Sequence, residues 1–195
     1  GGNDAGIVLP DVDPAAIAED LFWGAFINTG QTCAALKRLY VHDSVYDAVV
    51  EKLVEFAKHV PMGVGLDEQN VLGPLQNQKQ FDTVDRLVEA AKASGATVAL
   101  GGNPDRDAPG YFYPTTIVTD IDPHNDLVIE AQFGPALPVI RYTDVEAAIR
   151  LANELEFGLG ASVWSKERAQ ATAIAARLQA GTVLINSNGG LHPLV

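Results

Sequence analysis

Short runs of β-branched residues alternate with longer stretches of helical spacing along the whole chain. The predicted strands are Ile7–Leu9, Leu39–Val41, Thr97–Leu100, Thr116–Val118, Val139–Ile140, Ala161–Trp164 and Thr182–Ile185. Strands that are apolar on both faces and joined through helices pair in parallel, because tight turns cannot connect parallel neighbours. The pattern predicts an α/β fold: a doubly wound, mainly parallel sheet with helices on both faces.

Capping residues and breakers set the bounds of the helices that we expect. The predicted helices are Ala15–Phe26, Val45–Val60, Phe81–Ser94, Val145–Glu154 and Lys166–Ala180. The residues predicted to cap four of them are Asp13, Asp43 or Ser44, Thr143 or Asp144, and Ser165. Gly95 and Gly181 each follow a predicted helix, where a left-handed residue commonly ends it. The Gly- and Pro-rich stretch Gly101–Pro114 predicts a surface loop.

Length and charge narrow the class of protein. A chain of 195 residues, 47% hydrophobic, is expected to form a single domain over residues 1–195. Its formal net charge is −12, and no dense Lys/Arg cluster could neutralise phosphates, so a nucleic-acid partner is not expected. Every apolar run is too short to span a membrane. One cysteine allows no internal disulfide and no leader pattern is evident, which favours the cytoplasm.

That cysteine, Cys33, ends the small, glycine-bearing segment Phe26–Cys33 between two apolar runs. A thiolate is intrinsically nucleophilic, and small neighbours such as Gly30 and Ala34 let backbone N–H groups approach a substrate oxygen closely. Such a residue could attack a carbonyl carbon. Most lone cysteines, however, are inert buried residues, so position alone leaves both interpretations open.

A second element is the aromatic turn Phe133-Gly134-Pro135, which leads directly into a predicted buried strand. The ring of Phe133 could lie against a flat ligand ring, or it could cap the hydrophobic core. The turn alone favours the cap.

Together, several segments make the chain similar to the catalytic domain of an NAD(P)-dependent aldehyde dehydrogenase. The similar segments are Gly1–Asp4, which resembles the stretch just after the family's catalytic glutamate, Asn28–Cys33, Leu72–Leu75 with Gln80-Phe81, Phe133–Pro135, and Ala180–Val183 with Ile185-Asn186. Their order and spacing match the family over essentially the whole chain.

The resemblance implies a role for individual residues. Cys33 would be the nucleophile that attacks a small aldehyde, giving a thiohemiacetal and then a thioester, and its own N–H would stabilise the oxyanion. Gln80 and Phe133 would lie near the nicotinamide ribose and ring of NAD or NADP. Asn28 would stand beside the nucleophile without a chemical role.

The chain also departs from the family. It begins at Gly1, just past the place of the general-base glutamate, and it lacks the dinucleotide-binding domain and the asparagine that is the second oxyanion donor. Ala131 stands where the family has the glutamate that holds the nicotinamide ribose, and adjacent Glu130 would point to the opposite face. We therefore expect this fragment, which stops at Val195, to bind no cofactor and to be inactive or weakly active.

Three hypotheses remain open from the sequence. The chain is the catalytic domain of an aldehyde dehydrogenase, or a cofactor-independent thiol domain with esterase-like activity, or a catalytically silent scaffold or assembly module. An apolar surface left by a missing domain would favour a homodimer. The histidines, His42, His59, His124 and His192, lack the spacing of metal ligands, so we expect no metal site.

Overall fold

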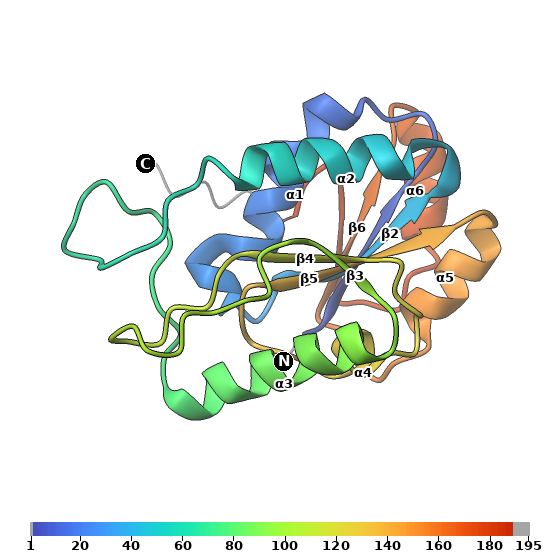
Figure 1. Cartoon of the computed structure of the whole chain (residues 1–195). Coiled ribbons are helices and arrows are strands. Elements are labelled where there is room, and N and C mark those ends of the chain that lie inside the picture. Colours follow the sequence, from blue (N-terminus) through green and yellow to red (C-terminus); the bar gives the residue numbers. More distant parts are fainter. Residues whose placement is uncertain (1, 189–195) are drawn as a thin grey trace.

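In a computed structural model of the chain, which describes residues 2–188, seven strands form one sheet in the order β3-β4-β5-β2-β1-β6-β7 (Figure 1). The strands are β1 (Asp4–Val8), β2 (Leu36–His42), β3 (Thr97–Leu100), β4 (Thr116–Thr119), β5 (Ala136–Tyr142), β6 (Gly160–Trp164) and β7 (Thr182–Ile185). Every pair is parallel except β3 with β4. The predicted α/β, mainly parallel architecture is confirmed.

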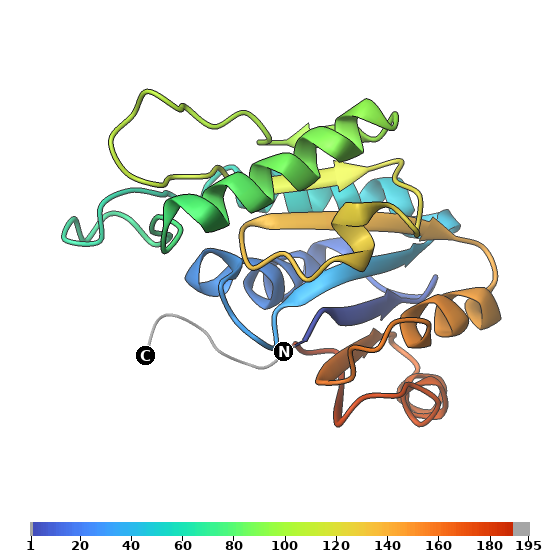
Figure 2. The same cartoon turned by 90° about the horizontal axis from the view of Figure 1, so that it is seen from below.

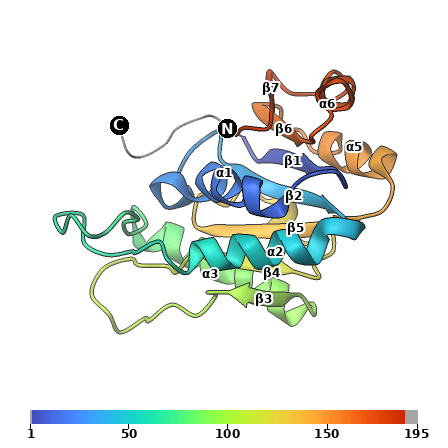
Figure 3. The same cartoon turned by 90° about the horizontal axis from the view of Figure 1, so that it is seen from above.

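Helices cover both faces of the sheet, as the views from below and above show (Figures 2 and 3). The helices are α1 (Pro14–Phe26), the short 3₁₀ segment η1 (Ile27–Gly30), α2 (Asp43–Ala57), α3 (Gln78–Ala93), α4 (Asp126–Ile129), α5 (Val145–Asn153) and α6 (Arg168–Ala175). One buried cluster joins the sheet to α1 and α2, and the other joins it to α3, α4, α5 and α6. The two apolar faces of the parallel strands account for both clusters.

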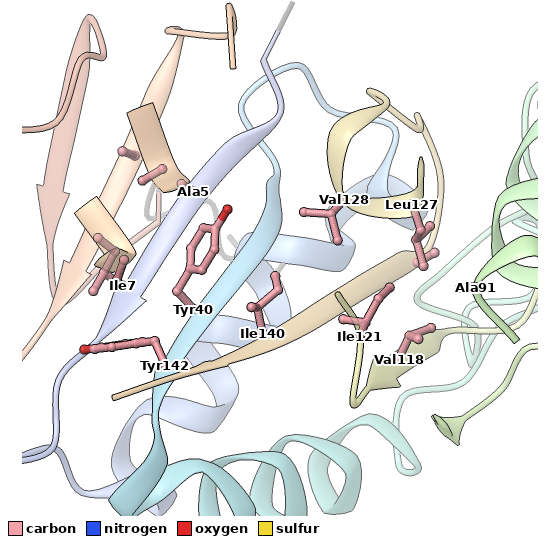
Figure 4. Packing of buried hydrophobic residues seen from close by; sticks show 14 of the residues in the cluster. Ala5, Ile7, Tyr40, Ala91, Val118, Ile121, Leu127, Val128, Ile140 and Tyr142 are labelled. Carbon is pink, nitrogen blue, oxygen red and sulfur yellow. The ribbon is translucent and has the colours of Figure 1, made fainter. Parts of the chain in front are cut away.

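The second cluster shows how strand residues meet helix residues. Tyr40 and Ile140 come from adjacent strands and lie next to each other, while Leu127 and Val128 of α4 point toward the same core (Figure 4). The hydroxyl of Tyr142, at the end of β5, donates a hydrogen bond to the Val8 carbonyl at 2.9 Å. A polar group in this core is therefore paired, as burial requires.

Several helix ends differ from the prediction. The N-cap of α2 is His42, not Asp43 or Ser44, and α6 begins after Glu167, which makes no side-chain cap. The same helix ends at Ala175 rather than Ala180, because the next two turns close through i to i−3 hydrogen bonds. Gly181 accordingly has no positive φ, whereas Gly95 has φ 98 and ends α3 as predicted.

The antiparallel strand β3 has a topological reason. No helix lies between β3 and β4, and the Gly101–Pro114 segment that connects them is a loop, as predicted. A parallel pair would need a longer crossover, usually through a helix. The four-residue helix α4, which begins at the cap Asn125, was not predicted, because four residues are too few to show helical spacing.

Strand β2 contains a β-bulge beside its first residue. Asp4 pairs with Leu36, but the next residue of β1, Ala5, pairs with Arg38, so Lys37 is the extra residue. The bulge reverses the alternation of faces. As a result Leu36 packs in the cluster of α1 and α2, while the Arg38 guanidinium donates to the Leu151 and Ala152 carbonyls at the end of α5.

Two classes of feature are missing from the described part of the chain. No helix within residues 2–188 is both long and apolar enough to cross a membrane. The same residues hold no group of three or more His, Cys, Asp or Glu that could bind a metal ion. His192 of the sequence analysis lies outside the described residues.

Asp4 is a buried carboxyl group at the start of β1, with 4% of its surface exposed. Its Oδ1 accepts a hydrogen bond from Gly160 N at 3.2 Å. Burial raises the pKa of Asp4 to about 6, although the Gly160 hydrogen bond and nearby Arg38 act in the opposite direction. The folded state therefore binds the Asp4 proton more tightly than the unfolded state, whose reference pKa is 3.8. As the pH rises from about 4 to about 6, ionisation of Asp4 therefore destabilises the folded state relative to the unfolded state.

We predict that Asp4→Asn raises the free energy of unfolding relative to wild type, and that this difference grows between pH 4 and pH 6. The pH-dependent part of the gain is at most about 3 kcal/mol, from roughly two pKa units at 1.36 kcal/mol each. Urea unfolding of both proteins at several pH values measures it. A difference that stays constant over this range would contradict the assignment.

Candidate active site

Cys33 lies in a tight turn between α1 and β2. Ala35 N donates to Thr32 O at 3.1 Å, which makes Cys33 the second residue of a four-residue turn. Its side chain is exposed. Among residues 2–188, no acceptor pairs with the backbone N–H groups of Cys33 and Ala34. The thiol is thus accessible, and two free donors stand beside it.

Left-handed backbone leads into this turn. Asn28, Thr29 and Gly30 have φ angles of 51, 58 and 71°. A positive φ is ordinary for glycine but an outlier for β-branched threonine. Two hydrogen bonds with Gly73 hold Thr29: its Oγ1 donates to Gly73 O at 2.9 Å and accepts from Gly73 N at 3.1 Å. The loop before Cys33 is therefore fixed by a segment more than forty residues away.

Gln31 adds a second connection to the same segment. Its Nε2 donates to Pro74 O at 3.2 Å, and its Oε1 accepts from Gln76 N at 2.8 Å. The Gly73–Gln76 segment leads directly into α3, whose N-cap is Asn77. The loop that carries Cys33 and the start of α3 are thereby held together.

A cavity of about 630 Å³ lies between these elements. The side chains that line it are Asn28, Gln31, Pro74, Leu75, Gln76, Asn77, Gln80 and Phe133. Five of the eight are amides and none is ionisable, so the lining can donate and accept hydrogen bonds without a net charge. The Nε2 atom of Gln80 is buried without an acceptor. A ligand with hydroxyl or carboxamide groups would supply one.

Gln80 and Phe133, which the resemblance places near the nicotinamide ribose and ring, both line this cavity. Cys33 does not itself line this cavity, but Asn28 and Gln31 of its loop do. Phe133 is 43% exposed, so it does not cap the core. Gln132 shapes the turn: its Oε1 accepts from Gly134 N at 3.0 Å, and its Nε2 donates to Ala136 O.

Ala131 and Glu130 are both exposed. Ala131 is exposed and offers no polar group. The Glu130 carboxylate pairs with Arg86 of α3 at 2.8 Å, so it already has a partner. No carboxylate lines the cavity.

Sequence reasoning missed Thr29 and Lys37. Lys37 is 3% exposed, and its Nζ donates to Gly134 O at 2.6 Å. One signal was present: a lysine within the apolar run of β2 is unusual, because lysine is almost never fully buried. The role of Thr29 depends on a contact with Gly73 that no local pattern reveals.

A second cavity, of about 550 Å³, lies between the end of α2 and the loop that follows β3. Its lining is mostly apolar, with Met62 and Phe112 among the larger side chains, and its charged residues are Lys58 and Asp105. It contains neither a cysteine nor a histidine. The region around Cys33 is therefore a stronger candidate for an active site than this second cavity.

Comparison with known sequences identifies relatives along the whole chain. Residues 1–193 match the profile of the aldehyde dehydrogenase family. The chain is 39% identical over 193 residues to succinate-semialdehyde dehydrogenase [NADP(+)] of Mycolicibacterium paratuberculosis, covering 99% of this chain and 41% of that protein. It is 37% identical over 186 residues to retinaldehyde dehydrogenase 3 of Mus musculus, covering 95% and 36%. The chain thus spans about two-fifths of the relatives it matches.

Solved structures of aldehyde dehydrogenases are also similar to this chain. Lactaldehyde dehydrogenase from Escherichia coli superimposes with a TM-score of 0.93 at 32% identity, covering 98% of this chain and 40% of that one. Betaine aldehyde dehydrogenase from Staphylococcus aureus, solved in complex with NAD+, gives a TM-score of 0.90 at 33% identity, covering 99% and 38%.

We predict that Gly30→Ala destabilises the protein by about 2–4 kcal/mol, from overpacking and the left-handed backbone together. A Cβ at Gly30 would lie 2.2 Å from Gly134 O and 2.7 Å from Lys37 Nζ, at φ 71°. Gly65→Ala is the matched control, because a Cβ there meets nothing within 4 Å, and it should change stability by less than about 0.5 kcal/mol. Urea unfolding compares them; equal effects would contradict the close approach.

Proposed function

Because this chain belongs to the aldehyde dehydrogenase family, we propose that residues 1–195 form a cysteine-bearing catalytic domain, whose complete enzyme oxidises a small aldehyde to a carboxylate with NAD or NADP. The observation that carries the proposal is the exposed Cys33 thiol, on a turn with free N–H donors, beside an amide-lined cavity. The names of the relatives support the reaction class.

The first step is nucleophilic addition. The Cys33 thiolate forms a bond to the aldehyde carbon, and the carbonyl electron pair moves onto oxygen. Backbone N–H groups next to Cys33 donate to that oxyanion; such fixed donors stabilise charge as it develops. They are available to the oxyanion, because they have no acceptor among residues 2–188. The product is a thiohemiacetal on Cys33.

The cavity fits the nicotinamide half of a cofactor in part. Gln80 Nε2 lacks an acceptor, and the other amides can hydrogen-bond a ribose or carboxamide. The exposed ring of Phe133 offers a flat face. When bound, NAD or NADP supplies the acceptor for the hydride that leaves the thiohemiacetal carbon. With Ala131 where the family has a carboxylate, we expect the chain to hold the ribose weakly.

Proton transfer is the weak point of this chain. The Cys33 thiol is exposed, and among residues 2–188 it has no side-chain hydrogen-bond partner that could accept its proton. Hydrolysis of the Cys33 thioester also needs a proton acceptor for the attacking water. A positioned general base typically contributes about 10²–10⁴-fold, and the chain by itself is accordingly expected to turn over slowly.

The esterase-like alternative uses the same thiol without a cofactor. An activated ester can acylate Cys33 because its leaving group departs without hydride transfer. Ala131 supports this alternative, because the residue stands where the family has a glutamate that holds the cofactor ribose, and esterase-like activity needs no cofactor. A homodimer and a cytoplasmic location stay predictions; the exposed apolar side chains Val64, Leu66 and Val71 are consistent with self-association.

We predict that an activated ester such as p-nitrophenyl acetate acylates the chain once, at Cys33. Release of p-nitrophenol and the intact mass should show one acetyl group per chain, and Cys33→Ser should show none. Adduct that persists in Cys33→Ser, or no adduct in wild type, would contradict the proposal. Faster deacylation with NAD+ would favour the dehydrogenase over the esterase-like function.

We also predict that Ala131→Glu lowers the Kd for NAD+ by about tenfold, because a carboxylate adds charge-assisted hydrogen bonds to ribose hydroxyls. Ala131 is exposed, so the substitution should not disturb folding. Isothermal titration calorimetry measures the Kd. The control Ala131→Gln has the same size without the charge and should gain less. Equal affinity of the two variants would argue against a ribose at this position.

A further inference from the structure

Lys37 occupies an irregular position in the sheet, one that none of the roles above explains. It is the extra residue of the β-bulge between β1 and β2, four residues after Cys33. Bulges commonly redirect a side chain next to a functional site. Without the bulge, residues 36 and 38 would share a face, and Lys37 would point opposite to both.

The lysine is buried at a cost that apolar packing would avoid. It is 3% exposed, and within residues 2–188 it forms no ion pair. Burial lowers the pKa of Lys37 to about 7, which shows how strongly the site opposes the charge. A methionine would fill a similar volume without desolvating an amine. Its hydrogen bond to the Gly134 carbonyl is the feature that distinguishes the lysine from such a residue.

That hydrogen bond joins the two loops of the candidate site. Lys37 Nζ donates to Gly134 O at 2.6 Å. Gly30 lies against both atoms, because a Cβ there would come within 2.7 Å of Nζ and 2.2 Å of the Gly134 oxygen. Gly30 belongs to the loop of Cys33, and Gly134 follows Phe133. The contact therefore fixes the thiol loop relative to the wall of the cavity.

The turn that carries Phe133 and Gly134 is itself held in place by hydrogen bonds. Gln132 holds Gly134 N at 3.0 Å and also donates to Ala136 O, so the turn is fixed to the start of β5. On the near side, Thr29 and Gln31 hold the thiol loop to residues 73–76. Lys37, in β2, reaches both loops: its Nζ lies close to Gly30 of the thiol loop and donates to Gly134 of the Phe133 turn.

We propose that Lys37 is a positioning residue: its amine clamps the Gly134 carbonyl against Gly30, so that the Cys33 loop and the Phe133 turn keep one relative geometry. The importance of this clamp for catalysis rests on the proposed function. The coupling of the two loops rests only on the contact between Lys37 and Gly134. Small displacements at a reacting centre are costly, because reaction requires aligned atoms at near-contact distance.

The coupling is tested by amide hydrogen exchange in the 195-residue chain. Lys37→Met keeps the length of the side chain and removes the donor, while Lys37→Gln keeps an N–H donor on a shorter, neutral side chain. Lys58→Met, at an exposed lysine just past the end of α2, is the matched control. Exchange in peptides covering residues 27–36 and 131–137 should rise together by about tenfold in Lys37→Met, less in Lys37→Gln, and not in the control.

Catalytic meaning is tested by two reactions at Cys33. Acylation by p-nitrophenyl acetate depends on the oxyanion donors and should slow by about tenfold or more in Lys37→Met. Alkylation by iodoacetamide needs no oxyanion and should stay within about twofold. Loss of both rates in parallel would indicate a general loosening of the fold and would overturn the positioning role, as would an unchanged acylation rate.

The two proposals fail differently. If wild type is not acylated at Cys33, the proposed function fails, while hydrogen exchange still decides whether Lys37 couples the loops. If wild type is acylated and both loops keep their exchange protection in Lys37→Met and Lys37→Gln, the clamp is wrong and the function stands. Cooperative urea unfolding of each variant confirms that a folded protein is being compared.

Discussion

The left-handed backbone of Asn28, Thr29 and Gly30 is the constraint on which the candidate site depends. Left-handed backbone costs non-glycine residues roughly 1–2 kcal/mol each, so the stretch persists only because its surroundings hold it. Thr29 satisfies its hydroxyl on Gly73, and glycine at position 30 allows Gly134 to approach. This stretch ends α1 and turns the chain into the Cys33 turn. The exposed Cys33 thiol therefore follows a stretch of backbone that is held in place.

The site lies at the amino-terminal ends of the parallel strands, which is the less usual side for a ligand. Ligands of doubly wound sheets usually bind outside the carboxyl ends of the strands. Here Cys33 precedes β2 and Phe133 precedes β5, so both stand at the amino ends of their strands, and α3 begins nearby (Figure 2). The β1–β2 bulge and the positive-φ loop gather at this edge as well. Such irregular features are costly in a regular sheet, and they concentrate where a side chain has to be aimed.

The two halves of the candidate site are unequally equipped. On the thiol side, the turn presents Cys33 with free N–H donors. On the cavity side, amides and an aromatic ring line the wall, and no carboxylate does. Lys37 joins the halves through a single hydrogen bond to Gly134. The thiol loop also contributes Asn28 and Gln31 to the cavity wall, and in our proposal the buried amine keeps the two halves in one relative geometry.

The sequence by itself determined the alternation of strands and helices, the Gly95 helix stop and the singular thiol, because apolar spacing, glycine conformation and residue identity are local properties. It also indicated Gln80 and Phe133 through resemblance, and the cavity that they share is consistent with that. Tertiary structure decided the antiparallel β3, the early end of α6, the exposure of Phe133, and the roles of Thr29 and Lys37. These depend on strand register and on contacts between residues 44 and 97 positions apart, which no window of sequence contains.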